Sequence, residues 1–326
     1  MTSTGPAKNL NHKPMSRAQT TSHLLMVRPA QFGFNAETAE NNAFQSRDQR
    51  LSPSEMREKA IEEFDQFVAQ LRAVGVNVLV AEDSTEPAKP DAVFPNNWVS
   101  FHQEGHIVTY PMFAPTRRLE RSEAVLQTVL DAGFQQTGSR WHLEQEEANN
   151  RFLEGTGSII FDHPHRLAYA CLSPRTDAAL LDQLCDLLGY KAVVFHSVDA
   201  HGQAVYHTNV MMALGETFVV ICLESVPDPE EKAKLLALFN ETGKEVVPIS
   251  LEQMNAFAGN MLQVRNQEGK TYLIMSETAY QSLSPAQIEQ LRRHTELLHS
   301  QLNTIETYGG GSARCMLAEI YLPKKN

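Results

Sequence analysis

The chain has 326 residues, enough to bury a large core, and its shares of hydrophobic (42%) and charged (21%) residues are ordinary for a globular protein. A formal net charge of −11 argues against a nucleic-acid partner, because binding to phosphate backbones depends on clustered lysine and arginine. No apolar run approaches the roughly 20 residues that span a bilayer, and no hydrophobic signal core opens the sequence. We therefore expect a cytoplasmic protein that does not bind membranes. Residues 1–20 are polar and rich in turn formers, which predicts a flexible leader.

Strand-like and helical segments alternate along the rest of the chain. Apolar runs of β type occur at residues 23–29, 76–82, 97–101, 106–111, 157–162, 166–172, 191–197, 218–224, 245–250, 261–266, 271–276 and 316–323. Helical patterns that begin near an N-cap residue or a proline occupy residues 52–75, 121–133, 176–189, 228–243 and 284–302. The first four of these end at glycine, and the last runs on. Each helical pattern and the strand-like runs beside it form one module. These modules recur about every 60 residues, a period too long for common solenoids. No linker divides them, so residues 21–326 are expected to form a single α/β domain.

The four cysteines are scattered without a CxxC pair, so neither a disulfide framework nor a zinc site is indicated. Cys171, Cys185 and Cys222 lie in apolar surroundings and are interpreted as small buried hydrophobic residues. Cys315 differs, because three consecutive glycines precede it in "TYGGGSARCM". A reactive thiolate needs a nearby base or a positive environment, so we looked for a partner for Cys315 among the polar residues.

His207 is the strongest candidate base among the twelve histidines. In "VYHTNVMMALG" it lies between apolar runs, and on a strand His207 and Asn209 would face the same side. Two polar side chains in such surroundings are costly unless they serve a purpose. His163 and His165 form an HxH pair, but a proline separates them and no acidic cluster is near. We expect no metal.

Two further stretches place polar residues at the edges of apolar runs. "FLEGTGSIIFD" puts Glu154 where a strand begins, and the small residues after it let a ligand or another chain approach. "PDAVFPNNWVSF" puts Asp91, Asn96 and Asn97 around an apolar run. Taken alone, each stretch fits ordinary turn chemistry better than a functional site.

Together these residues resemble a known family. The set of Asp91 to Asn97, Glu154, His207 with Asn209, and Cys315 occurs in the order, and with the neighbours, of the guanidino-group-modifying enzymes. These form the amidinotransferase and deiminase superfamily, also called penteins. The resemblance runs from "LLMVRP" to "CMLAEIYLP", and it is strongest to the branch of the citrulline-utilisation hydrolases. It implies a five-bladed α/β propeller with pseudo-fivefold symmetry, which agrees with the five modules.

The resemblance also implies roles for the site residues. Cys315 would attack the central carbon of a guanidinium, amidine or ureido group. His207 would act as general acid and base, and Glu154 would orient it, which is the logic of a catalytic triad. The glycines before Cys315 would let a flat amidine reach the sulfur. The substrate would be a small amino acid. No phosphate-binding glycine loop accompanies the helices, so we expect no nucleotide or other cofactor.

The sequence departs from the deiminase pattern in ways that bear on the substrate. Deiminases and dimethylarginine hydrolases usually carry an aspartate in place of Asn97 and of Asn209, and the second aspartate of their LEGGD motif is missing here. A carboxylate only accepts hydrogen bonds, which suits a cationic guanidinium, whereas an asparagine also donates them, which suits a neutral ureido group. Succinylarginine dihydrolases share both asparagines, however, and start from a guanidinium. We expect a hydrolase acting on citrulline or an arginine derivative. An amidinotransferase and a non-catalytic binding module of the same fold remain alternatives.

Arginine side chains are expected to bind the substrate carboxylate, because their planar fork pairs with it bidentately. The stretch "APTRRLER" offers Arg117 and Arg118, and "CLSPRTDAA" offers Arg175. We take Arg118 and Arg175 as the candidates, with a surface salt bridge to Glu120 or Asp177 as the alternative for each stretch. A papain-like protease is excluded, since its cysteine lies in a different signature near the N-terminus. The oligomeric state is left open.

Overall fold

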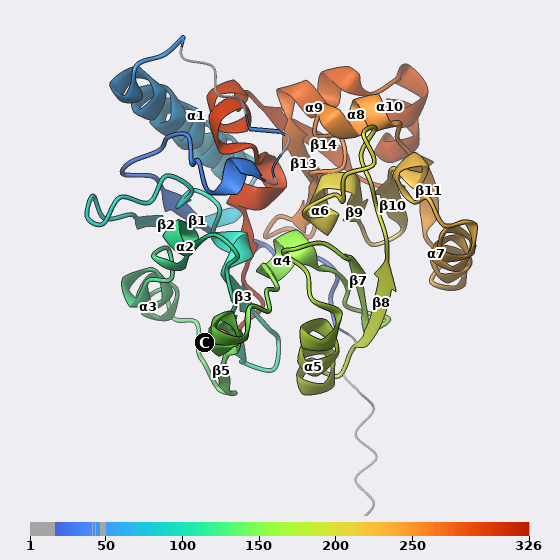
Figure 1. Ribbon diagram of the computed structural model, residues 1–326, viewed down its shortest axis with the longest axis horizontal. Coiled ribbons are helices and arrows are strands. Elements are labelled where there is room, and N and C mark those ends of the chain that lie inside the picture. The colour runs from blue at the N-terminus through green and yellow to red at the C-terminus, as the bar shows by residue number, and fades with distance from the viewer. Residues whose placement is uncertain (1–16, 41, 43, 46–49, 326) are drawn as a thin grey trace, which may run out of the picture.

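The structure is a computed structural model that describes residues 17–40, 42, 44–45 and 50–325. Within these residues, fifteen strands form five three-stranded sheets (Figure 1). The strands are β1 (His23–Arg28), β2 (Asn77–Glu82), β3 (Val99–Phe101), β4 (Ile107–Thr109), β5 (Arg140–His142), β6 (Ile160–Asp162), β7 (Leu167–Cys171), β8 (Lys191–Phe195), β9 (Met212–Leu214), β10 (Phe218–Ile221), β11 (Glu245–Pro248), β12 (Leu262–Arg265), β13 (Thr271–Ser276), β14 (Glu296–Ser300) and β15 (Ala318–Glu319). The fold is therefore mixed α/β with small sheets.

All five sheets repeat one pairing scheme. The middle strand (β1, β4, β7, β10 or β13) is antiparallel to one neighbour and parallel to the other. A parallel pair needs a crossover connection, and helices supply it here. The crossover helices are α1 (Pro53–Ala73), α3 (Glu123–Asp131), α5 (Ala178–Leu188), α7 (Pro229–Glu241) and the pair α9 (Glu277–Ser282) and α10 (Pro285–Arg292). They lie around the outside of the molecule in Figure 1. The shorter helices are α2 (Pro115–Arg118), α4 (Gly155–Ser158), α6 (Thr208–Met211) and α8 (Leu251–Asn255).

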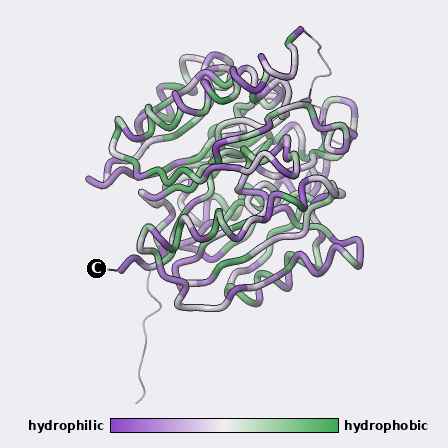
Figure 2. The backbone as a smooth tube through the Cα atoms, turned by 90° about the vertical axis from the view of Figure 1, so that its left-hand side faces the viewer, coloured by the Kyte–Doolittle hydropathy of each residue, from purple (hydrophilic) through white to green (hydrophobic). Residues whose placement is uncertain are grey.

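Local sequence explains where the long helices begin and end. Ser52 caps α1, and its side chain and that of Glu55 form a reciprocal capping box, with Pro53 in the first turn. Gly75 follows the helix at φ +85°, a conformation that favours glycine. The inner face of α1 buries Phe64 and Leu71 completely against the first sheet. Figure 2 shows the same division over the molecule, with hydrophobic residues gathered inside and hydrophilic ones on outer turns.

The helix expected over residues 284–302 is wrong in its second half. Helix α10 ends at Arg292, and Glu296–Ser300 forms β14, which pairs in parallel with β13 from Tyr272↔Glu296 onwards. The leucines of this segment fit a helix locally, but pairing with an open sheet edge overrides weak local propensity. Strands β5 (RWH) and β9 (MAL) were also missed.

The two ends of the described chain meet in one sheet. Strand β1 pairs with β2 on one side and with β15 on the other, at Leu24↔Glu319 and Leu25↔Ala318. Residues 1–16 of the expected leader lie outside the described residues. Its last four residues are not loose, which corrects the prediction: Thr20 is buried, and the buried Arg17 donates to the carbonyl of Leu188 at 2.9 Å. Among the described residues, no helix is both long and apolar enough to cross a membrane.

Candidate active site

A short turn precedes the antiparallel outer strand of every sheet, and these turns carry the candidate residues. The turns are Pro95–Asn97 before β3, α4 before β6, α6 before β9, residues 256–259 before β12 and Ala313–Met316 before β15. The turn at Pro95–Asn97 contacts both α4 and Ala313–Met316, and α4 contacts α6. Residues that are up to about 220 positions apart are thus brought together by one repeated piece of local structure.

The expectation that His207 and Asn209 share a strand face is wrong. His207 has extended backbone angles at the N-cap of α6, and Asn209 lies within that one-turn helix. Glu154 likewise lies at the N-cap of the one-turn helix α4. The short turns therefore replace the expected strand ends. They place His207 in the lining of one cavity, and Glu154 and Asn209 in contact with residues that line it.

This cavity has about 280 Å³ of empty space. Its lining residues are Thr38, Asn42, Asp91, Phe94, Asn97, Arg117, Arg175, Tyr206, His207, Gly309, Gly310, Gly311 and Cys315. Five of the residues predicted from sequence are among them: Asp91, Asn97, Arg175, His207 and Cys315. Three others, Asn96, Glu154 and Asn209, are fully buried but do not line the cavity.

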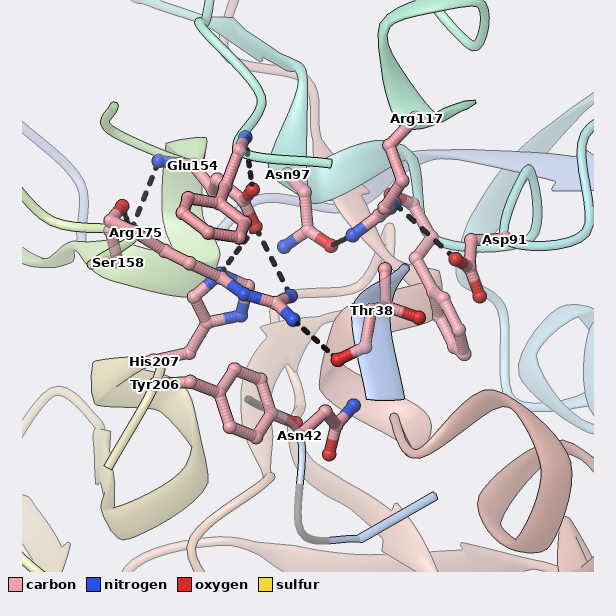
Figure 3. Close-up of polar contacts among 12 residues, drawn as sticks. Thr38, Asn42, Asp91, Asn97, Arg117, Glu154, Ser158, Arg175, Tyr206 and His207 are labelled. Atoms are coloured by element: carbon pink, nitrogen blue, oxygen red, sulfur yellow. Dashed lines mark hydrogen bonds and ion pairs between the residues drawn. The ribbon is translucent and has the colours of Figure 1, made fainter. Parts of the chain in front are cut away.

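His207 and Glu154 form a buried pair, with 2.7 Å between Nε2 and Oε2 (Figure 3). Burial alone would raise the pKa of Glu154, but the charge of Arg175 and the His207 hydrogen bond lower that pKa to about 2. Burial lowers the pKa of His207 to about 4, although Glu154 acts in the opposite direction. The ionised carboxylate can only accept, so Nε2 carries the proton and Nδ1 of the neutral imidazole is bare. This arrangement leaves Nδ1 able to take up a proton.

Two asparagine side chains contact the sulfur of Cys315. The Nδ2 atoms of Asn209 and Asn260 lie 3.4 and 3.2 Å from Sγ. Asn260 was not found from sequence, although comparing the five modules would have singled it out, since it directly follows the turn before β12. The other three cysteines are buried free thiols, as expected. Burial raises the pKa of Cys171 to about 11 and that of Cys185 to about 12.

The three glycines bring the chain close to the cavity wall. A Cβ atom on Gly309 or Gly311 would lie 2.8 or 2.9 Å from the ring of Phe94, which leaves no room for a side chain. Gly310 has φ +65°, and a Cβ there would lie 2.5 Å from Nδ2 of Asn42. The glycines therefore allow close packing beneath Cys315 as well as access to it.

Arg117 lines the cavity, and Arg118 does not. Arg117 donates twice to Glu120, at 2.8 Å each, and once to Oδ1 of Asn97, also at 2.8 Å. Arg118 turns outward to the carbonyl of Met112 and to Glu147, and its side chain is about one-third exposed. The structure therefore corrects the choice of Arg118. Consecutive residues of the one-turn helix α2 point in different directions, and sequence could not tell which one points inward.

Asp91, Asn96 and Asn97 each leave polar atoms without a partner among the described residues. Asp91 accepts from Asn35 at 2.7 Å through Oδ2, while its other oxygen is unbonded. Burial raises the pKa of Asp91, and Arg117 opposes that shift. Asn97 uses Oδ1 for Arg117 and leaves Nδ2 unbonded, and neither side-chain atom of Asn96 has a partner. Buried polar atoms without partners are rare in folded proteins, so those on residues that line the cavity are candidate contacts for a ligand.

Arg175 crosses the other side of the cavity. Its guanidinium lies 3.5 Å from Oε2 of Glu154, donates to the carbonyl of Thr38 at 3.0 Å and stacks over the ring of Tyr206. The hydroxyl of Tyr206 in turn donates to the carbonyl of Gly310 at 2.8 Å. Figure 3 shows the Asn97 amide between Arg117 and the Glu154–His207 pair, with Arg175 on the side of that pair.

No group of three or more His, Cys, Asp or Glu is placed to hold a metal ion within the described part of the chain. The two histidines of the HxH pair point to separate partners. His163 contacts the hydroxyl of Tyr190 at 2.6 Å, and His165 contacts Asp162 at 2.8 Å.

A protein-family model described as eukaryotic N,N dimethylarginine dimethylhydrolase matches residues 28–322. The chain belongs to this family. It thereby belongs to the guanidino-group-modifying, or pentein, superfamily, as the motifs predicted. No curated protein sequence matches the chain.

Solved structures share the fold at low sequence identity. The arginine dihydrolase ArgZ of the cyanobacterial ornithine–ammonia cycle superposes with a TM-score of 0.72 at 17% identity, over 93% of this chain and 41% of ArgZ. The chain thus spans about two fifths of that enzyme, and it matches 99% of the ArgZ N-terminal domain. A dimethylarginine dimethylaminohydrolase, solved as an adduct with S-methyl-L-thiocitrulline, gives a TM-score of 0.63 at 16% identity over 92% of this chain and all of the other.

Proposed function

We propose that this protein is a cytoplasmic, cysteine-dependent hydrolase that cleaves a C–N bond in a ureido amino acid such as citrulline, by way of a covalent intermediate on Cys315. His207 is the general acid and base, and Glu154 orients it. Three observations support these roles: the family membership, the buried Glu154–His207 pair, and the presence of both His207 and Cys315 in the lining of one cavity. Four free cysteines are typical of a reducing compartment.

The observation that carries the substrate class is the orientation of the Asn97 amide. Arg117 has only donors, so the atom that faces it must be Oδ1 of Asn97. The unbonded atom is then Nδ2, a donor on a residue that lines the cavity. A donor needs an acceptor, which the carbonyl oxygen of a ureido group offers and a guanidinium lacks.

The remaining groups suit the two charged ends of an amino acid. The unbonded oxygen of Asp91 can accept from an α-ammonium group, and Arg175 can donate to an α-carboxylate. Arg117 is a poorer choice for the carboxylate, because Glu120 and Asn97 already occupy most of its donors.

The reaction follows from these positions. As the C–S bond forms between Cys315 and the ureido carbon, the thiol proton passes to Nδ1 of His207. His207 returns it to the nitrogen that leaves, which breaks the first C–N bond. Water, deprotonated by His207, then attacks the thiocarbamate carbon, and the proton returns to the sulfur as the C–S bond breaks. The released carbamate loses carbon dioxide, which breaks the second C–N bond. With citrulline the balance is one water consumed and ornithine, ammonia and carbon dioxide formed.

A guanidinium substrate such as arginine is the second candidate. The unbonded carboxylate oxygen of Asp91 favours a cation, and the fold matches that of an arginine dihydrolase. Hydrolysis of arginine would pass through a ureido product, which the same cavity would then bind.

The test is to incubate the purified protein separately with citrulline, arginine and N-succinylarginine and to measure ammonia, ornithine and citrulline. We expect ammonia and ornithine from citrulline at the highest kcat/KM, unaffected by exhaustive chelation. Release of ammonia from none of the three would refute the substrate class. Ammonia from arginine alone would favour the second candidate.

We propose, finally, that the five sheets are the blades of an α/β propeller. The support is contact between the antiparallel outer strands of neighbouring sheets: β15 with β3, β6 with β9, and β9 with β12. We also propose that residues 21–326 form a single domain, and that Arg17 to Thr20 pack against it.

A further inference from the structure

The side chain of Asn260 is held in one orientation by the backbone around it. Its Oδ1 accepts from the N–H of Arg314 at 3.1 Å, and its Nδ2 donates to the carbonyl of Asn209 at 2.9 Å. A backbone N–H can only donate and a carbonyl can only accept, so exchanging the two amide atoms would break both bonds. These two backbone bonds therefore fix which end of the amide faces the sulfur of Cys315: it is the Nδ2 group, a donor, at 3.2 Å.

Asn209 presents a second amide to the same sulfur. Its Nδ2 lies 3.4 Å from Sγ, and its own Oδ1 has no partner. All three residues are buried, with Asn209 and Asn260 at most 1% exposed and Cys315 at 4%. Amide donors that are shielded from water stabilise an anion without carrying a charge themselves.

The titratable groups around Cys315 are turned away from its sulfur. Those that share its cavity or its turn are Asp91, Arg117, Arg175, Tyr206, His207 and Arg314. The guanidinium of Arg117 pairs with Glu120, and that of Arg175 lies beside Glu154. Arg314 turns back to the carbonyl of Leu317 and to Glu319. In the described part of the chain, the side chains within hydrogen-bond distance of Sγ are those of the two asparagines. Oδ1 of Asn260 also lies 3.6 Å from Sγ and accepts from the thiol while it is protonated, whereas the closer Nδ2 donates to the sulfur.

His207 is also poorly suited to form an ion pair with the sulfur. Burial lowers the pKa of His207 to about 4, so the imidazole is neutral near neutral pH. A cationic substrate could supply the missing charge, but a ureido substrate is neutral. The enzyme then needs another way to stabilise a negative sulfur.

We propose that Asn209 and Asn260 form an amide clamp that stabilises negative charge on the sulfur of Cys315, so that the nucleophile gives up its proton to His207 without a cationic substrate. Asn260 is thereby a catalytic residue, since it touches the reacting sulfur. This inference rests on Cys315 being the nucleophile of the proposed reaction, and it explains why an asparagine suits position 209. An aspartate there could not donate to the sulfur and would add a like charge.

The test is the rate at which iodoacetamide, a neutral reagent, alkylates Cys315 in the ligand-free protein, followed by mass spectrometry from about pH 5 to about pH 10. Asn260→Asp and Asn209→Asp should each shift the midpoint of the rate profile upward by about one to two pH units, because a hydrogen bond to an ion is worth one to two tenfold steps. Asn240→Asp adds the same charge on the exposed surface of α7 and should leave the midpoint unchanged.

Thermal unfolding of each variant identifies any that fail to fold. If Asn260→Asp does not fold, the profile of Asn209→Asp decides the question alone. A midpoint equal to that of the unmodified protein in the folded site variants would overturn the proposal. The alkylation experiment contains no substrate, so its result can be interpreted independently of the proposed function. A failure to hydrolyse citrulline, arginine or succinylarginine would refute the proposed function but not the amide clamp.

Discussion

Single polar atoms decide what the cavity can bind. Asn97 and Asp91 each have one side-chain atom bonded to protein and one left open, and the bonded atom determines the character of the open one. Arg117 binds Oδ1 of Asn97, so the atom of Asn97 that remains for a ligand is the donor Nδ2. Comparing amide and carboxylate side chains by residue type, as the sequence allows, cannot reveal that assignment.

Changing Asn97 to aspartate should invert the substrate preference. Asn97→Asp keeps an acceptor for Arg117 and replaces the open donor with an acceptor, which repels a ureido oxygen and suits a guanidinium. We expect kcat/KM for citrulline to fall about tenfold to hundredfold, with a smaller loss or a gain for arginine. Steady-state kinetics on both substrates measures this, with Asn240→Asp as the control. Equal losses for the two substrates would argue against the assigned role.

Removing the nucleophile should lower the turnover rate more than removing its base. Cys315→Ser should abolish turnover, because a hydroxyl is a far weaker nucleophile without strong activation. His207→Ala should lower kcat by about 100- to 10,000-fold, the usual cost of losing a general acid and base. Ammonia release measures both, and His201→Ala, at an exposed histidine, is the control. A haloacetamidine should label Cys315; preferential labelling of Cys171, Cys185 or Cys222 would refute the assignment.

At the scale of elements, the sequence predicted whether a segment is a helix or a strand better than it predicted where that segment begins and ends. The crossover helices α1, α3, α5 and α7 were predicted because capping residues and glycines mark both of their ends, as Ser52 and Gly75 do for α1. Strand β14 was missed because only its parallel pairing with β13 makes it a strand. The turns α4 and α6 were missed because one helical turn has no periodicity to detect. Glu154 and His207 were found all the same, since their motif does not depend on the local backbone.

The turn α4 supports the site through Gly157. A Cβ atom there would lie 2.4 Å from Nδ2 of Asn97 and 2.8 Å from Nδ1 of His207. Gly157→Ala must therefore displace both side chains, and we expect kcat/KM to fall on the order of a hundredfold, since an error of about 1 Å at a reacting group has that effect. Gly33 has open space around it and no strained φ, so Gly33→Ala is a matched control. Near-normal kinetics in Gly157→Ala would show that the packing is looser than described.

On the scale of the whole molecule, buried neutral histidines link stability to pH. Burial lowers the pKa of His163 to about 3 and that of His207 to about 4, and it lowers the pKa of His102 well below its usual value. Below about pH 6.5 the unfolded chain binds protons that the folded one does not, so stability falls as the pH falls from about 6.5 toward 4. We expect Tm to fall over that range in calorimetry. His163→Gln, which cannot titrate, should flatten the slope, and an unchanged slope would contradict the assignment.

Closure of the chain through its first sheet leads to the last prediction. Strand β1 is held by β2 near the start of the chain and by β15 near its end, so a fragment that lacks either end leaves that sheet incomplete. The buried guanidinium of Arg17 binds the carbonyl of Leu188 in α5, which also ties the first described residues to the middle of the chain. Limited trypsin digestion should therefore spare the bond after Arg17 and leave one large resistant species, as mass spectrometry of the products would show. Two stable fragments of comparable size, or rapid cleavage after Arg17, would contradict a single closed domain.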